Sequence, residues 1–162
     1  MNNIVYRKSI KEDIKQINQL FIEMINTVNN RMKREGFETY NEFENGYEEG
    51  YLDNFYIDNN KVIYVALDKD KVVGFISIEK YRERGYIYLD DYCVNNNYRG
   101  YGIGTKLMNM ALEFAKKEEI NNIITHVEKT NTESIKFYKN NHFKIEQEQG
   151  HRLLIKRITK EG

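Results

Sequence analysis

The sequence predicts an α/β domain built on one mixed sheet, and three observations support this fold class. Segments with the alternating pattern of β-strands are interspersed with segments that repeat apolar residues every three or four positions, as amphipathic helices do. Short polar turns connect some strands, which makes these pairs antiparallel, while helices connect others. The length of 162 residues suits one domain, so we predict a single domain over residues 1–162.

The N-terminal part begins with a short predicted strand over residues 3–7, followed by two helices. Ser9 and Glu12 have the spacing of a capping box, which indicates where the first helix starts. The apolar periodicity of this helix is carried by Ile14, Ile17, Leu20, Phe21, Met24, Ile25 and Val28. A second helix is predicted over about residues 40–55, because Tyr40, Phe43, Tyr47, Tyr51 and Phe55 follow the same spacing.

The remaining elements are six strands and two helices. The strands are predicted over residues 61–67, 72–81, 86–94, 122–127, 143–147 and 152–158. One helix spans residues 103–117, and a shorter one ends near Lys139 after the capping box Thr130-Asn131-Thr132-Glu133. The predicted order is therefore β-α-α-β-β-β-α-β-α-β-β, with antiparallel hairpins in the middle of a mixed sheet.

Composition excludes several classes of protein. Lys plus Arg and Asp plus Glu each number 25, and this zero net charge argues against a general nucleic-acid binder or a polybasic membrane anchor. The single cysteine, Cys93, excludes an intrachain disulfide framework, and three histidines without metal-ligand spacing give no reason to expect a metal. The first residues have no signal-peptide pattern and no apolar run is long enough for a membrane helix, so we expect a cytoplasmic protein.

The most informative segment is Arg99-Gly100-Tyr101-Gly102-Ile103-Gly104-Thr105, which lies between a predicted strand and a predicted helix. Its glycines allow a sharp turn and a close approach of the backbone to a ligand. The free N–H groups of a helix N-terminus bind phosphate, and Arg99 and Lys106 add charge. The loop fits neither a P-loop nor the dinucleotide fingerprint, so it predicts a pyrophosphate site of another kind. The alternative is a glycine-rich turn that only ends the strand.

Two motifs together resemble the GNAT superfamily of N-acetyltransferases. The run Leu89-Asp90-Asp91-Tyr92-Cys93-Val94 is followed by Tyr98-Arg99-Gly100-Tyr101-Gly102-Ile103-Gly104, which contains the family pattern Arg/Gln-x-x-Gly-x-Gly/Ala. The segment 131–138 resembles the second motif, in which Asn131 precedes Phe137-Tyr138. The element order also resembles the family over nearly the whole chain. One departure is His142, where the family usually has glycine; this position is expected to adopt a left-handed conformation.

The resemblance implies a GNAT-like domain with splayed central strands and acetyl-CoA, or another acyl-CoA, as the acyl donor. The pyrophosphate is then expected on the backbone N–H groups of residues 99–105. The pantetheine arm is expected to pair with the open edge of the strand carrying Tyr92-Cys93-Val94, as an added strand would. Asn131 is expected to hydrogen-bond the same arm. A homodimer is implied only by analogy with the family.

The resemblance also suggests catalytic residues. Tyr138 is the candidate general acid, because a phenol can protonate the leaving CoA thiolate, and it lies about two helical turns from Asn131 on the same face; the alternative is a packing role beside Phe137. Asp90 and Asp91 are the candidate general bases. Strand alternation predicts that only one of them faces the acceptor cleft. The alternative for each is an ordinary solvated charge at the edge of the strand. Cys93 is expected to be a structural thiol rather than a nucleophile.

The predicted acceptor follows from an acidic segment. Residues 35–58 contain eight acidic residues and neither Lys nor Arg, so the zero net charge divides into +4 for residues 1–34, −8 for this segment and +4 for residues 59–162. Acids beside an aromatic stripe suit a cationic amine, through charge attraction and cation–π contact. The alternative is a stripe that faces the core and acids that face solvent.

We therefore predict an acetyl-CoA-dependent N-acetyltransferase that acts on a primary amine of a small cationic molecule. Two other functions fit the same sequence. One is acetylation of a protein N-terminus or lysine, which requires an open groove for a peptide. The other is a non-catalytic acyl-CoA-binding regulator.

Overall fold

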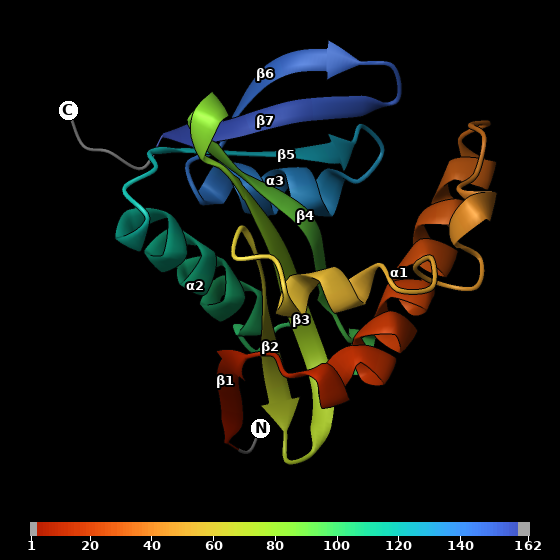
Figure 1. Cartoon of the computed structure of the whole chain (residues 1–162). Helices are drawn as coiled ribbons and strands as arrows, with labels where there is room; N and C mark the ends of the chain where they lie inside the picture. Colours follow the sequence, from red (N-terminus) through yellow and green to blue (C-terminus); the bar gives the residue numbers. More distant parts are fainter. Residues whose placement is uncertain (1–2, 159–162) are drawn as a thin grey trace.

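The structure, a computed structural model, describes residues 3–158 and confirms the predicted mixed α/β fold (Figure 1). The ends of the predicted domain, residues 1–2 and 159–162, lie outside the described residues. Within the described residues, seven strands form one sheet in the order β1-β2-β3-β4-β5-β7-β6. The strands are β1 Ile4–Lys8, β2 Lys61–Asp68, β3 Lys71–Tyr81, β4 Tyr86–Val94, β5 Asn122–Glu128, β6 Lys144–Gln149 and β7 Arg152–Ile158. The α-helices are α1 Ile14–Arg34, α2 Ile103–Lys117 and α3 Thr132–Asn140.

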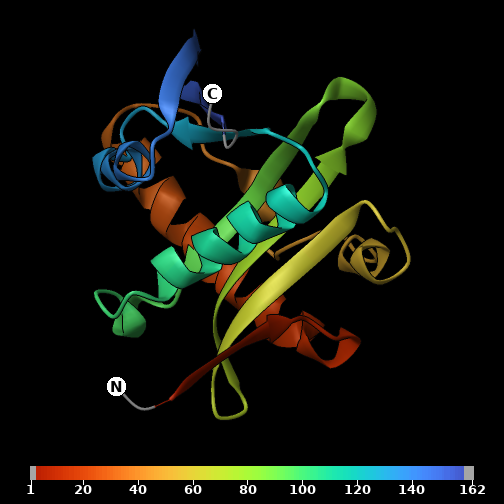
Figure 2. The ribbon, with the colours of Figure 1, turned by 90° about the vertical axis from the view of Figure 1, so that its left-hand side faces the viewer.

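The helices cover both faces of the sheet and divide the hydrophobic core into two clusters. Figure 2 shows α2 in front of the sheet and α1 behind it. Alternate residues of β2 supply the two clusters: Val62 packs on the α2 side, whereas Ile63 and Val65 pack on the α1 side. The α2 helix contributes Leu107 and Met108 to the first cluster, and neither is exposed. Each face of the sheet is therefore closed by its own layer.

The centre of the sheet opens between β4 and β5. These two parallel strands pair over only three positions, from Tyr86 with Asn122 to Tyr88 with Ile124. Beyond Tyr88, β4 stays with β3 while β5 stays with β7, so the two strands diverge. This gap is the predicted splay of the central strands. Beyond the last pair, the Thr125 hydroxyl donates a 2.7 Å hydrogen bond to the Leu89 carbonyl across the gap.

A β-bulge in β4 lies at the start of this gap. Ser77 of β3 pairs with Asp91 and Ile78 pairs with Leu89, which leaves Asp90 as an additional residue in β4. A bulge changes the phase of strand alternation, so residues on either side of it no longer follow the simple two-residue period.

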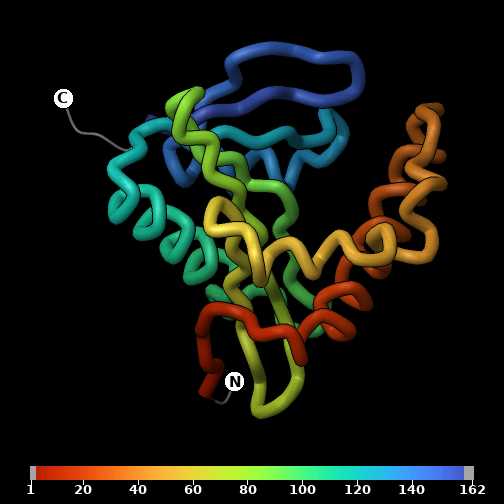
Figure 3. Tube along the Cα trace, viewed as in Figure 1, coloured from red at the N-terminus to blue at the C-terminus, as the bar shows by residue number. Residues whose placement is uncertain are grey.

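The predicted helix over residues 40–55 is wrong. The structure has two short 3-10 turns there, Asn41–Phe43 and Leu52–Tyr56, and Figure 3 follows this chain from the end of α1 back across the sheet. Gly46 and Gly50 interrupt a helix because their φ angles are +92° and +84°. A side chain on Gly46 would collide with Asn18, whose amide oxygen accepts the Tyr47 N–H at 2.9 Å.

Two predicted capping boxes also use different residues. At the start of α1, the Asp13 carboxylate accepts the Ile10 N–H at 2.9 Å, while the Ser9 hydroxyl accepts a hydrogen bond from Tyr56. At α3, Asn131 is the cap and accepts the Ser134 N–H at 3.1 Å. His142 has a φ of +69°, which confirms the predicted left-handed conformation.

Candidate functional site

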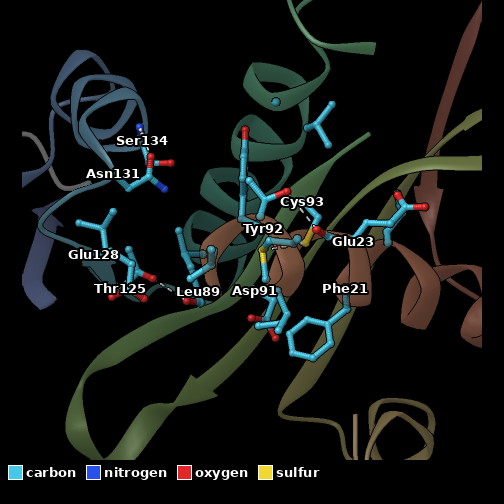
Figure 4. A pocket seen from close by; sticks show the side chains of 18 of the residues that line it. Phe21, Glu23, Leu89, Asp91, Tyr92, Cys93, Thr125, Glu128, Asn131 and Ser134 are labelled. Carbon is cyan, nitrogen blue, oxygen red and sulfur yellow. Dashed lines mark hydrogen bonds between the residues drawn. The ribbon is translucent and has the colours of Figure 1, made fainter. Parts of the chain in front are cut away.

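A cavity of about 800 Å³ passes through the gap between β4 and β5. On one side it is lined by α3 and the glycine loop, and on the other by α1 and residues 40–51. Figure 4 shows Asn131 and Ser134 on one side, Phe21 and Glu23 of α1 on the other, and Asp91 between them. The cavity is thus open to both faces of the sheet, so two molecules can meet in the gap from opposite sides.

The glycine loop at the first side has the geometry of an anion site. Gly100 and Gly102 have φ angles of +83° and +81°, and Gly102 caps the N-terminus of α2. A Cβ at either position would have no atom of the described residues within 4 Å, so the space before the loop is open. Arg99 lines the cavity, while the Lys106 ammonium lies over the Tyr6 ring at 5.5 Å. The loop's N–H groups and Arg99 are therefore the groups available to a phosphate.

The other predicted cofactor residues contribute in different ways. Gly104, Thr105 and Asn131 line the cavity, as do Tyr92 and Val94 on the unpaired part of β4. A Cβ on Gly104 would collide with the Tyr92 hydroxyl, so this glycine permits the ring to pack against the first turn of α2.

Of the other predicted cofactor residues, Cys93 and Ile103 also line the cavity, whereas Tyr101 does not. The Cys93 thiol lies 3.2 Å from the Met24 sulfur, on the α1 side. The Tyr101 side chain is 58% exposed, and Ile103 is buried in the core. Burial raises the pKa of the Cys93 thiol, which suits the structural role predicted for it.

Tyr138, the predicted general acid, is buried at the point where β4 and β5 diverge. Its hydroxyl lies within hydrogen-bonding reach of Thr125, whose own hydroxyl bonds the Leu89 carbonyl. Its ring packs edge-on against Phe143. Burial raises the pKa of Tyr138, so the phenol keeps its proton across the physiological pH range.

Asp90 and Asp91 both line the cavity, so the prediction that strand alternation separates them is wrong. The bulge at Asp90 is the reason. The Tyr51 hydroxyl donates to Asp90 at 2.6 Å, and the Tyr47 hydroxyl donates to Asp91 at 2.5 Å. Burial, with the neighbouring charge of Asp90, raises the pKa of Asp91 to about 7 despite the Tyr47 hydrogen bond. Burial also raises the pKa of Asp90.

The aromatic stripe forms a stack that positions these hydroxyl groups. Phe21 stacks on Tyr47 with ring centroids 3.8 Å apart, and Tyr47 stacks on Tyr51 at 5.1 Å. The Lys61 ammonium lies 5.7 Å from the Tyr51 centroid. Because aromatic rings cover both faces of Tyr47, the predicted cation–π contact is unavailable to this ring. The tyrosines of the stripe instead donate their hydroxyl groups to carboxylates of the cavity.

The acidic segment contributes less to the cavity than predicted. Of its eight acids, all within the described part of the chain, Glu48 alone lines the cavity. The remaining acids that line it come from α1, β4, β5 and α3: Glu23, Asp90, Asp91, Glu128 and Glu133. The negative charge of the cavity therefore comes mainly from outside residues 35–58.

Sequence reasoning missed a second polar group on the wall beside α1. The Tyr88 hydroxyl lies 2.7 Å from Nδ1 of His126, and Nε2 of His126 lies 2.7 Å from the Gln149 side-chain oxygen. Nearby, Glu128 accepts the Tyr40 hydroxyl at 3.0 Å. The only signal in the sequence was that residues 126 and 128 share a strand face, and this spacing does not say which strand lies beside them.

The described residues contain no group of three or more His, Cys, Asp or Glu side chains that could hold a metal ion. Within the same residues, 3–158, no helix has the length and apolar character needed to cross a membrane.

Comparisons with known proteins agree with this geometry. The model of the acetyltransferase (GNAT) family matches residues 23–143. Streptothricin acetyltransferase A of Bacillus subtilis (strain 168) is 28% identical over 100 residues, which cover 61% of this chain and 57% of that protein. This chain therefore aligns with less than two thirds of that relative's length.

Two solved structures resemble the whole fold or its larger part. The PaiA N-acetyltransferase from Thermoplasma acidophilum, in complex with coenzyme A, has a TM-score of 0.79 and 19% identity, over 97% of this chain and 99% of that one. A putative streptothricin acetyltransferase from Bacillus anthracis str. Ames, in complex with acetyl coenzyme A, has a TM-score of 0.59 and 26% identity, over 68% and 69% of the two chains.

Proposed function

Because this chain belongs to the acetyltransferase (GNAT) family, we propose that it transfers the acetyl group of acetyl-CoA directly to a primary amine of a small cationic molecule. One observation carries the proposal. Tyr138 and the Asp90–Asp91 pair lie on the two sides of one gap in the sheet, within one cavity. A proton donor for the leaving group and a proton acceptor for the nucleophile thus flank the same point.

The residues on the α3 side fit acetyl-CoA. The open space before Gly100 and Gly102, at the N-terminus of α2, suits the pyrophosphate. The part of β4 from Asp91 to Val94 has no partner on its β5 side, so its main-chain groups can bond the pantetheine amides as a neighbouring strand would. Asn131 lies at the same wall of the cavity. When bound, acetyl-CoA supplies the thioester at the gap.

Tyr138 protonates the CoA sulfur as the carbon–sulfur bond breaks. A phenol has an ordinary pKa of about 10 and a thiol one of about 8.5, so the hydroxyl is protonated when the thiolate forms. Burial strengthens this preference for the protonated form.

Asp90 and Asp91 attract the acceptor as an ammonium ion, and Asp91 takes its first proton. An amine attacks only as the free base, while an alkyl ammonium group has a pKa of about 10. A carboxyl group with a pKa of about 7 is a better base than an ordinary aspartate, and it is charged at neutral pH for part of the time. The tyrosine hydroxyl groups hold both carboxylates in place.

The choice of a small cationic acceptor rests on the walls of the α1 side. Acidic side chains face it from α1, residue 48, β4 and β5. Residues 40–51 lie over it and donate three tyrosine hydroxyl groups to its carboxylates, which leaves less room for a peptide chain. The likeness to proteins named for streptothricin, a small molecule, also favours this acceptor class.

Thiol release from acetyl-CoA tests the proposal, with polyamines, basic amino-acid amides and peptides as acceptors. We expect release with small cationic amines and a fall in kcat of about 10²-fold in Tyr138→Phe, within the range typical of a general acid. Preference for peptides would support the protein acetyltransferase. Tight binding of acetyl-CoA without release from any acceptor would support the regulator and refute the transferase.

A further inference from the structure

A chain of hydrogen bonds leads from the gap to the edge of the sheet on the α1 side. It links Tyr88 of β4, His126 of β5, and Gln149 and Gln147 of β6. Tyr88 is the last β4 residue that pairs with β5, and His126 is the second β5 residue beyond the paired part. Both line the cavity. This series of hydrogen bonds therefore starts beside the point where the acetyl group and the amine would meet.

The side-chain amide groups of Gln147 and Gln149 determine which group donates in each of these hydrogen bonds. The Gln149 side-chain nitrogen donates to the Gln147 oxygen at 2.9 Å, so the Gln149 oxygen points toward His126. That oxygen accepts a hydrogen bond, which places the imidazole proton on Nε2. Nδ1 then carries the lone pair and accepts the Tyr88 O–H at 2.7 Å. The lone pairs of the Tyr88 oxygen are left for an N–H donor in the cavity.

The surroundings of Tyr88 connect it to both groups of the proposed mechanism. Asp90 and Asp91 are among the charges that raise its pKa, and Tyr88 in turn is among the groups that raise the pKa of Tyr138. Tyr88 thus lies within electrostatic reach of both the carboxylate pair and the general acid. Burial lowers the pKa of His126 below its ordinary value, so the imidazole is mostly neutral at pH 7 and has the capacity to accept a proton.

An acceptor that arrives as an ammonium ion loses two protons from nitrogen. The first leaves before attack, and Asp91 is placed to take it. The second leaves as nitrogen bonds to the acetyl carbon, and a carboxyl group that has just been protonated cannot accept it. The reaction therefore needs a second proton acceptor, or a return of Asp91 to its charged form before the bond is complete.

We infer that Tyr88 and His126 form a relay that accepts this second proton; the inference rests on the proposed acetyl transfer. As the carbon–nitrogen bond forms, the Tyr88 oxygen takes the proton from nitrogen and gives its own proton to Nδ1 of His126. The carbon–sulfur bond breaks, and the sulfur leaves with the electron pair and receives the proton of Tyr138. Solvent then takes the protons from His126 and Asp91 and returns one to Tyr138.

The charges around His126 suit a transient imidazolium. Glu128 lies on the same strand and favours the protonated form, while Arg152 of β7 opposes it. Asp90 and Asp91 face Tyr88 from β4. Both imidazolium N–H groups would have acceptors already in place, the Tyr88 oxygen and the Gln149 oxygen. Tyr88 is the catalytic residue of this relay, and His126 acts through it.

The test compares the two proton acceptors by their pH dependence. Single-turnover thiol release is measured between pH 7 and 9.5, with saturating acetyl-CoA and one small amine substrate. We expect His126→Gln and Tyr88→Phe to lower the rate by about 10- to 100-fold at every pH. The rate of Asp91→Asn should be reduced most at pH 7 and should recover toward pH 9.5, because the free amine becomes more abundant as the pH rises. Tyr86→Phe, on the same strand but outside the cavity, is the control.

The outcomes separate the relay from a structural role. A Kd for acetyl-CoA within twofold of wild type in Tyr88→Phe, which removes one oxygen only, would show that the site is intact. A wild-type rate in Tyr88→Phe would overturn the relay but leave the proposed acetyl transfer intact. So would a loss of rate in His126→Gln and Tyr88→Phe that disappears at high pH, as it does in Asp91→Asn. Absence of thiol release by wild-type protein with every amine would instead refute the proposed function, and the relay with it.

Discussion

The two sides of the β4–β5 gap are built from different kinds of contact. On the α3 side, the glycine loop, the N-terminus of α2 and the Asn131 cap each come from a few consecutive residues. On the α1 side, Asp90 bonds a tyrosine 39 positions away, Asp91 one 44 positions away, and Glu128 one 88 positions away. Local sequence specifies the first side, and tertiary packing assembles the second.

The two sides of the gap should therefore tolerate different substitutions. On the α3 side, Gly104 packs against the Tyr92 hydroxyl, so this position is sensitive to added atoms. The α1 side holds carboxylates away from water, so it is sensitive to charge. Substitutions that alter one property but not the other therefore separate the two sides experimentally.

The largest expected effect is on stability, through the buried charge of Asp91. Its pKa in the folded protein, about 7, lies above the ordinary value of 3.8, so the folded state binds the proton more tightly than the unfolded state. The contribution of Asp91 to the stability of the wild-type protein should therefore fall as pH rises from 4 to 7. Asp91→Asn avoids this loss, and its free energy of unfolding at pH 8 should exceed that of wild type by roughly 2–4 kcal/mol.

Urea denaturation at pH 4 and pH 8 measures this difference, without ligands. The advantage of Asp91→Asn should be small at pH 4, where the aspartate is mostly protonated in the folded state. An equal advantage at both pH values would contradict a charge effect. Asp53→Asn, at an exposed position of the same chain, is the matched control.

The next effect is on cofactor binding, through Gly104. A methyl group there would collide with the Tyr92 hydroxyl, so Gly104→Ala should weaken acetyl-CoA binding by about tenfold, equivalent to about 1.4 kcal/mol. The Tyr92 hydroxyl is buried and has no hydrogen-bond partner among residues 3–158, so Tyr92→Phe alone should bind acetyl-CoA normally. Isothermal titration with acetyl-CoA measures both.

The double variant Gly104→Ala, Tyr92→Phe sharpens this prediction. The next atom of the Tyr92 ring would be 3.4 Å from the added Cβ, which is an ordinary contact. Removal of the hydroxyl should therefore restore most of the affinity for acetyl-CoA. Failure of the rescue would mean that Gly104 is needed for another reason, such as close approach of the phosphates to the backbone.

The smallest expected effect is on acceptor affinity, through the acidic segment. Glu48 lines the cavity while Glu42 and Glu49 are exposed outside it, so the three acids are not equivalent. Glu48→Lys should raise the KM of a cationic amine by about three- to fivefold, and less so at high salt. Steady-state thiol release at two salt concentrations measures it.

Glu42→Lys and Glu49→Lys, which make the same charge change, are the controls and should stay within twofold of wild type. Equal increases in KM for all three variants would indicate that the whole segment attracts the acceptor through its net charge. An unchanged KM in Glu48→Lys would show that the negative charge of residues 35–58 does not contribute to acceptor recognition.

Much of the fold was predictable because it depends on neighbours in the chain. The strand over 86–94 and the helix over 103–117 have the predicted bounds, and the left-handed His142 follows from the rule for residues that end a helix. The helix predicted over 40–55 is absent because periodicity was visible but the conformations of Gly46 and Gly50 were not. The same aromatic spacing gives a stack of rings without an α-helix.

The sequence by itself determined the family of this protein and the α3 side of the gap. A glycine loop before a helix and an asparagine at a helix cap have their chemistry within a few residues, since helix ends and turns are local structures. Only the tertiary structure decided the α1 side of the gap. The bulge that turns Asp90 and Asp91 to one cavity, the tyrosines that hold them, and the Tyr88–His126 pair all depend on which strands and segments lie side by side. Pairing between distant segments is set by packing of the whole core, and short patterns do not encode it.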